Sequence, residues 1–128
     1  MTRIPTVLSD LGVKLAEPDG GARVVRGRPG RRGRKAAVLI LFSGPDRARP
    51  EDLELVLIEK SATLRKHAGQ CAFPGGGVEE SDPSSEAAAL REAREEVGVD
   101  AATVELLGVL PPAHVAVTGY DVTPVIAW

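Results

Sequence analysis

The chain has 128 residues, a length that predicts a single domain because domains average roughly 150 residues. A formal net charge of -2, with 43% hydrophobic and 27% charged residues, is ordinary for a globular protein. This composition excludes collagen-like, mucin-like and fully disordered chains. The longest apolar run, residues 36–42, is far shorter than the roughly 20 residues that a membrane-spanning helix needs, and no signal segment opens the chain. We therefore expect a cytoplasmic protein with no membrane partner.

Cysteine and aromatic residues are scarce, and this limits the kinds of site that the chain can build. The one cysteine, Cys71, cannot form an internal disulfide and cannot hold a structural zinc ion by itself. We expect its thiol to be buried and inert. Aromatic residues make up 3% of the chain, which leaves little material for stacking nucleic-acid bases. The composition therefore does not favour a nucleic acid as partner.

The N-terminal part of the chain is predicted to lie outside the folded domain. Residues 4–16 carry apolar side chains at near-helical spacing, which predicts an amphipathic helix. Residues 18–35 are rich in glycine and arginine, which is typical of a basic linker. We therefore divide the chain into residues 1–35, a helix and linker, and residues 36–128, the domain. The arginines of the linker fit a phosphate-binding role as well as a solvated linker.

Four strands and one helix are predicted in the domain. Residues 36–42 are continuously apolar, which predicts a central strand buried on both faces. A β-type pattern over residues 53–60 predicts a second strand that forms a hairpin with the first, and residues 104–110 and 122–128 are further strand candidates. The helix is expected over residues 83–97, with Asp82 as N-cap, Pro83 at the first helical position and Gly98 ending it. These elements predict a mixed α/β domain.

The predicted helix carries three glutamates on one face. Glu92, Glu95 and Glu96 are three and four residues apart, while the apolar side chains of Leu90, Ala93 and Val97 lie on another face that can pack on the sheet. Like charges at this spacing destabilise a helix, and the negative end of the helix dipole adds to the cost. A divalent cation would offset the repulsion, because Mg²⁺ prefers carboxylate oxygens. A solvated acidic face is the alternative for the glutamates taken alone.

The glutamates follow three consecutive glycines, Gly75 to Gly77, whose backbone can approach a charged ligand closely. The run from Gly76 to Val99, which contains the segment REAREEVGV, resembles the Nudix box, the loop and helix of hydrolases that act on nucleoside diphosphate derivatives. Ahead of the helix the pattern departs: the family's glutamate falls at Pro83 by strict count, and Asp82 stands nearest to it. The resemblance implies a Nudix fold of the α+β class, a mixed β-sheet sandwiched by helices.

The resemblance also implies a metal site and a set of catalytic residues. The metal would be Mg²⁺ or Mn²⁺, held by the carboxylates of Glu92, Glu95 and Glu96 and by the backbone carbonyl of Gly76. Glu92, Glu95 and Arg91 would be the catalytic residues, with the guanidinium of Arg91 orienting a glutamate through a charge-assisted bond.

A second resemblance, to the coenzyme A pyrophosphatase branch of the Nudix family, implies a substrate. It rests on residues 57–61, 64–70, 73–76, 108–112 and 118–124. It implies hydrolysis of coenzyme A or a related nucleotide. Arg65 and Lys66, which precede the glycine turn, and Gly75 and Gly76 are candidates to contact the substrate, and a solvated surface is the alternative for Arg65 and Lys66. Ile58 and Lys60 depart from the branch, which has threonine and arginine at these positions, so another nucleoside diphosphate derivative remains an alternative substrate.

The C-terminus is predicted to be short for this family, because residues 125–128 end the chain within an apolar run. Nudix domains generally continue with further strands and a helix. We expect the chain to leave a sheet face or edge exposed, which a homodimer or another partner would cover. A catalytically silent domain that binds a nucleotide or a protein is therefore a third hypothesis.

Overall fold

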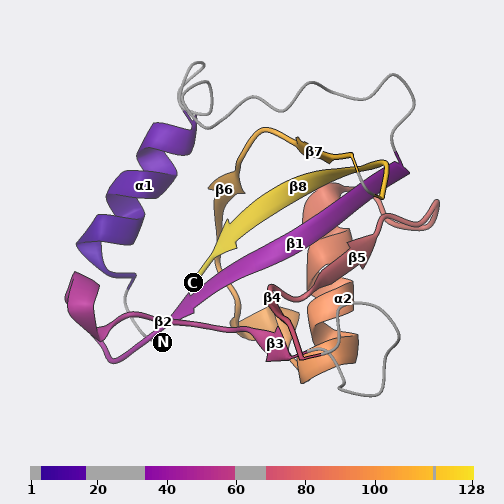
Figure 1. Cartoon of the computed structure of the whole chain (residues 1–128). Coiled ribbons are helices and arrows are strands. Elements are labelled where there is room, and N and C mark those ends of the chain that lie inside the picture. The colour runs from indigo at the N-terminus through magenta and orange to yellow at the C-terminus, as the bar shows by residue number, and fades with distance from the viewer. Residues whose placement is uncertain (1–3, 17–33, 60–68, 117) are drawn as a thin grey trace.

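The structure is a computed structural model that describes residues 4–16, 34–59, 69–116 and 118–128 (Figure 1). Within these residues, two α-helices, α1 and α2, and two short 3-10 helices, η1 and η2, accompany eight strands. Their bounds in chain order are α1 Thr6–Ala16, β1 Arg34–Ser43, η1 Pro50–Asp52, β2 Glu54–Leu55, β3 Ile58–Glu59, β4 Cys71–Ala72, β5 Gly75–Gly77, α2 Ser85–Val97, η2 Ala101–Thr103, β6 Leu106–Val109, β7 Ala113–Val115 and β8 Tyr120–Ala127.

Strand β1 is the centre of a mixed sheet, as predicted, but it is not fully buried on both faces. Ala37, Leu39 and Leu41 are buried, whereas Val38, Ile40 and Phe42 on the opposite face are half-buried. It pairs in parallel with β8 along nearly its whole length, from Arg34 opposite Tyr120 to Leu41 opposite Ala127. On its other side β1 pairs antiparallel with β2 and with β5. Strands β6 and β7 pair antiparallel with β8, while β3 and β4 form a separate two-stranded ladder. The expected mixed sheet and the hairpin of β1 with β2 are confirmed.

Helix α2 covers one face of this sheet and builds the core with it. The alternate β1 residues Ala37, Leu39 and Leu41 are buried together with the β8 residue Val125 and the α2 residues Ala88, Ala89 and Ala93. Alanine on the helix face allows a close approach to the strands, so the packing is tight although the side chains are small. Leu90 packs against this core as expected. Val97 was expected there too but is 39% exposed, because it lies at the last position of the helix.

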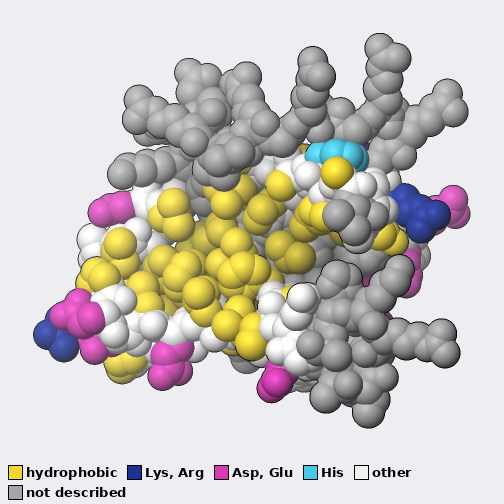
Figure 2. Space-filling view, in the orientation of Figure 1, with side chains coloured by type: hydrophobic (Ala, Val, Ile, Leu, Met, Phe, Trp, Pro, Cys, Tyr) yellow, Lys and Arg dark blue, Asp and Glu magenta, His cyan; other side chains and the backbone are white. Residues whose placement is uncertain are grey.

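The other α-helix, α1, lies alongside β6 rather than over the middle of the sheet (Figure 1). Its Leu8 is 3% exposed, which confirms that the predicted N-terminal helix has an apolar face. Figure 2 shows hydrophobic side chains gathered on the molecular face turned toward the viewer, where β1 and β8 lie in front of α2 in Figure 1. The expectation of an exposed apolar sheet face is met only in part, because the β1 residues Val38, Ile40 and Phe42 are half-buried and Ile126 of β8 is 4% exposed.

The two ends of α2 decide where the glutamates lie. Ser84, not Asp82, is the N-cap: its hydroxyl accepts the backbone N–H of Ala87 at 3.1 Å. The prediction of Asp82 as N-cap was wrong because its carboxylate is engaged elsewhere, as described below. Gly98 ends the helix as predicted, with a φ of 71° in the left-handed region that glycine adopts without strain. Both ends are thus fixed by local residues.

Replacing Ser84 with alanine removes the N-cap hydrogen bond. We expect the free energy of unfolding to fall by about 1 kcal/mol, the usual cost of losing a serine cap. Urea denaturation followed by far-UV circular dichroism measures this change. Ser84→Asn, which keeps a capping side chain, is the control; no loss in Ser84→Ala, or an equal loss in both variants, would contradict Ser84 as the N-cap.

Two strand predictions and the expected burial of Cys71 need correction. The strand expected over residues 53–60 is broken into β2 and β3, because Val56 turns into the core and the chain then pairs with β4. The strand expected over 104–110 begins only at Leu106, after η2, and β4, β5 and β7 were not predicted. Cys71 is exposed rather than buried, because β4 belongs to the small ladder and not to the main sheet.

Candidate active site

Strand β5 and helix α2 lie against each other, and the glycines of β5 meet two of the three glutamates. The backbone N–H of Gly75 donates to the Oε1 of Glu96 at 3.2 Å. A Cβ placed on Gly76 would come within 2.7 Å of the carboxyl carbon of Glu92, so this carboxylate occupies the space that any larger residue would need. Both carboxylates therefore lie against β5, on the same side of the helix.

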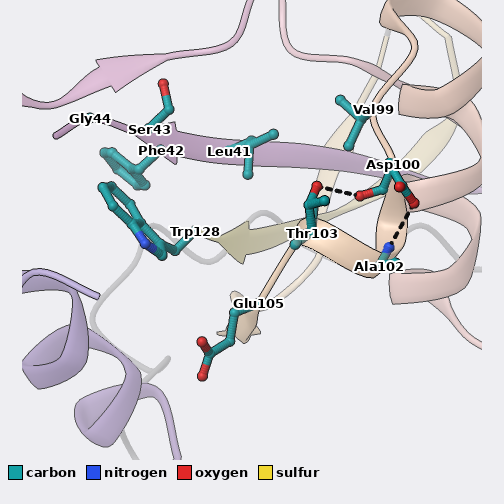
Figure 3. A pocket seen from close by; sticks show the side chains of 11 residues that line it. Leu41, Phe42, Ser43, Gly44, Val99, Asp100, Ala102, Thr103, Glu105 and Trp128 are labelled. Atoms are coloured by element: carbon teal, nitrogen blue, oxygen red, sulfur yellow. Dashed lines mark hydrogen bonds between the residues drawn. The ribbon is translucent and has the colours of Figure 1, made fainter. Parts of the chain in front are cut away.

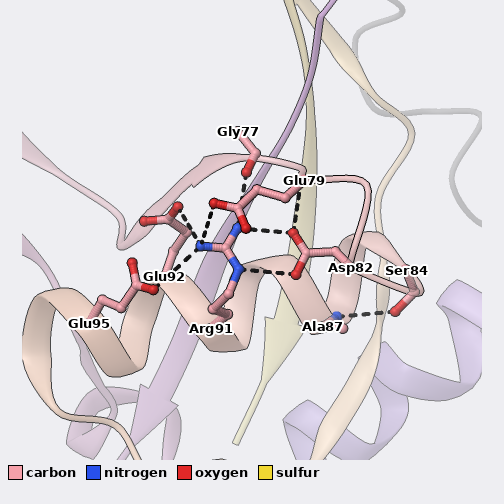
Figure 4. A network of polar contacts seen from close by, with 8 residues as sticks. All are labelled: Gly77, Glu79, Asp82, Ser84, Ala87, Arg91, Glu92 and Glu95. Carbon is pink, nitrogen blue, oxygen red and sulfur yellow. Dashed lines mark hydrogen bonds and ion pairs between the residues drawn. The ribbon is translucent and has the colours of Figure 1, made fainter.

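Arg91 is the centre of a polar network between the loop after β5 and the helix (Figure 4). Its Nε and Nη2 donate to the two carboxylate oxygens of Asp82 at 3.0 and 2.9 Å, and Nη2 also donates to the backbone carbonyl of Gly77 at 3.1 Å. Its Nη1 donates to Glu92 at 3.0 Å. The expectation that Arg91 orients a glutamate is consistent with this contact, and the same side chain fixes the loop to the helix.

The paired geometry of Asp82 and Arg91 changes their titration. The two hydrogen bonds from Arg91, and the backbone N–H of Glu79 that donates to Asp82 at 2.8 Å, hold the pKa of Asp82 below its usual value. Asp82 in turn raises the pKa of Arg91. The side chain of Asp82 is 6% exposed, so the carboxylate depends on these partners instead of water.

The lowered pKa predicts a pH dependence of stability. A carboxylate whose folded pKa is depressed stabilises the fold above its unfolded pKa of about 3.9 and loses this contribution as the pH falls through the folded value. We therefore expect Asp82→Asn to reduce stability more at pH 7 than at pH 3. Denaturant midpoints of both proteins at the two pH values measure this. An equal deficit at both pH values would contradict the depressed pKa.

Carboxylates and a backbone carbonyl are the hard oxygen donors that Mg²⁺ and Mn²⁺ prefer, so the chemistry of the donor set fits a divalent metal. Within the described ranges, however, no group of three or more acidic, histidine or cysteine side chains converges on one point. The cause is visible in the contacts: Glu92 is held by Arg91, Glu96 by the Gly75 backbone, and the Glu95 side chain is 61% exposed. A metal would have to draw these carboxylates together.

The predicted site residues fall into two groups. The structure brings together Arg91, Glu92, Glu95, Glu96, Gly75 and Gly76 where β5 meets α2. Arg65 and Lys66, predicted to contact substrate, lie outside the described residues. Sequence reasoning missed the carbonyl of Gly77 and the carboxylate of Glu79, which is 3.6 Å from Nη1 of Arg91. An acidic residue three positions before Asp82 in a turn was the available signal for Glu79.

A cavity of about 910 Å³ lies elsewhere, at the end of the sheet where β1 and β8 finish (Figure 3). Phe42 and Trp128 lie side by side at one end of it, and η2 forms another wall. The Asp100 side chain there already accepts the backbone N–H of Ala102, and the backbone carbonyl of Asp100 accepts the hydroxyl of Thr103. None of the predicted site residues that the structure describes lines this cavity.

A mixed sheet, a glycine strand and a helix bearing glutamates are the features expected of a Nudix domain, and comparison with known proteins agrees. The family model described as "NUDIX domain" matches residues 33–125. The chain belongs to the Nudix family. It is 57% identical over 93 residues to an "Uncharacterized Nudix hydrolase NudL" of Escherichia coli strain SMS-3-5, and 58% identical over the same length to a protein with that name in Citrobacter koseri.

These alignments cover 73% of the chain and 45% of each relative, so the chain spans less than half the length of these curated relatives. Among solved structures, a Nudix hydrolase from M. smegmatis, RenU, superposes with a TM-score of 0.56 at 24% identity, covering 80% of this chain and 62% of that one. A C. elegans Ap4A hydrolase gives 0.56 at 19% identity, covering 75% and 67%. Both likenesses confirm the predicted fold class.

In the described part of the chain, no helix is long and apolar enough to span a membrane.

Proposed function

We propose that this chain carries a metal-dependent hydrolase activity that cleaves the pyrophosphate bond of a nucleoside diphosphate derivative, and that the derivative is coenzyme A or a close relative. The observation that supports the reaction class is the position of Glu92 and Glu96 against Gly75 and Gly76, with Arg91 fixing Glu92. Coenzyme A is favoured by the residues that resemble the coenzyme A pyrophosphatase branch, including residues 64–70.

Each site residue has a role in this proposal. Glu92, Glu95 and Glu96, with the carbonyl of Gly76, would hold Mg²⁺ or Mn²⁺. The bound metal would neutralise charge on the phosphate oxygens and lower the pKa of a bound water. Arg91 fixes Glu92 in place rather than meeting the substrate, because Asp82, Gly77 and Glu92 accept four short hydrogen bonds from it. Arg65 and Lys66 are proposed to contact the substrate phosphates, and Gly75 and Gly76 to let it approach the backbone.

The experiment incubates the 128-residue chain with coenzyme A and Mg²⁺ or Mn²⁺, and follows the products by chromatography. We expect 3′,5′-ADP and 4′-phosphopantetheine, and no product when EDTA replaces the metal. Parallel incubations with a dinucleoside polyphosphate and a nucleotide sugar test the substrate assignment. Turnover of either of these in place of coenzyme A would keep the reaction class and overturn the substrate.

A catalytically silent binding domain makes the opposite prediction. In a domain that binds no metal, three glutamates at this spacing would only destabilise the helix. The chain nevertheless has all three. Folded protein that turns over none of the substrates in either metal would overturn the proposed activity and favour the silent domain.

A further inference from the structure

The guanidinium of Arg91 has five N–H donors, and four of them are used in short hydrogen bonds. Two go to Asp82, one to the carbonyl of Gly77 and one to Glu92, all between 2.9 and 3.1 Å. The fifth, on Nη1, faces two further carboxylates, those of Glu79 and Glu95, whose oxygens are each 3.6 Å from that nitrogen. Nη1 therefore has three acidic neighbours and only two N–H groups that can donate hydrogen bonds to them.

These three neighbours differ in where they come from (Figure 4). Glu92 and Glu95 lie on α2, among the carboxylates proposed to bind the metal. Glu79 lies in the loop after β5. Asp82 of the same loop forms an ion pair with Arg91, and its carboxylate also accepts the backbone N–H of Glu79. The side chain of Glu79 is 61% exposed, so it can move toward Nη1 without disturbing packed neighbours.

We propose that Glu79 is a positioning residue that takes over Nη1 of Arg91 when Glu92 and Glu95 turn to the metal. This inference rests on the proposed metal-dependent function. A carboxylate that binds a metal ion has less negative charge left to attract a guanidinium. Metal binding by Glu92 would therefore weaken its ion pair with Arg91. Glu79 then keeps the half-buried guanidinium paired, which lowers the cost of releasing Glu92 and so raises metal affinity.

The test measures Mn²⁺ binding by isothermal titration calorimetry, without substrate, in the unchanged chain and in Glu79→Gln. Glu80→Gln is the matched control, because Glu80 is the next residue, is also exposed, carries the same charge and makes no ion pair within the described residues. We expect the Mn²⁺ Kd to rise about tenfold in Glu79→Gln, as for other residues that support metal ligands, and less than about twofold in Glu80→Gln. Glu79→Asp, which keeps the charge on a shorter side chain, should recover part of the affinity.

Thermal unfolding in EDTA separates this role from a structural one. In the metal-free protein Nη1 keeps Glu92, so the midpoints of the unchanged chain and Glu79→Gln should agree. A lower midpoint for Glu79→Gln in EDTA, or equal Mn²⁺ affinities for the Glu79 and Glu80 variants, would overturn the inference while leaving the proposed function intact. Failure of the unchanged chain to bind Mn²⁺ would overturn both.

Discussion

Glu96→Gln is expected to lower metal-dependent kcat by about 10²- to 10³-fold while leaving the fold intact. Glutamine has the same shape and keeps an oxygen that can accept the N–H of Gly75, so the contact between α2 and β5 survives. The substitution removes the negative charge, which attracts a divalent cation but does not stabilise the helix. Because the charge lies near the negative end of the helix dipole, its loss should even relieve some repulsion in the metal-free protein.

The matched measurements are kcat with saturating Mn²⁺ and the thermal midpoint in EDTA, for Glu96→Gln and for Glu54→Gln. Glu54 is an exposed glutamate in β2, and its loss should leave both quantities near those of the unchanged chain. Turnover by Glu96→Gln at the parent rate would remove Glu96 from the metal site. A large fall in the EDTA midpoint would instead assign Glu96 a structural role.

The sequence predicts the parts of the site that depend on residues close together along the chain. The shared face of Glu92, Glu95 and Glu96 follows from helical periodicity, and Gly98 ends the helix for a local conformational reason. The central strand follows from its unbroken apolar composition. Each of these features is decided by neighbours within a few positions, so a single sequence is enough to predict it.

The features that were missed depend on partners far along the chain. Asp82 and Ser84 are both good N-caps by residue type. Arg91, nine residues beyond Asp82, binds the carboxylate of Asp82, so Ser84 caps the helix instead. Three consecutive glycines have little intrinsic tendency to form a strand, yet β5 forms because β1 offers an antiparallel partner. Cys71 is exposed because β4 pairs with β3 instead of the main sheet.

Alanine substitutions at the three glycines of β5 are expected to give three different results, because a methyl group at each position meets a different neighbour. At Gly75 it would overlap the backbone of β1 at the carbonyl oxygen of Ala37. Backbone in a central strand cannot move aside, so Gly75→Ala should cost about 1–3 kcal/mol of stability through overpacking. Among the described residues, the methyl group of Gly77→Ala meets the ring of Tyr120 at 4.0 Å, an ordinary contact, so stability and kcat should be nearly unchanged.

Gly76→Ala should separate activity from stability. Its methyl group would lie 2.7 Å from the Glu92 carboxyl group, the far end of a flexible side chain that can move aside at little cost to the fold. A displacement near 1 Å at a reacting centre is enough to lower kcat by about 10²-fold. Denaturant unfolding and kcat on the same three preparations measure both effects. Because Gly77→Ala places the same methyl group one residue away, equal activity of the Gly76 and Gly77 variants would show that the Glu92 position in this structure is not the one used in catalysis.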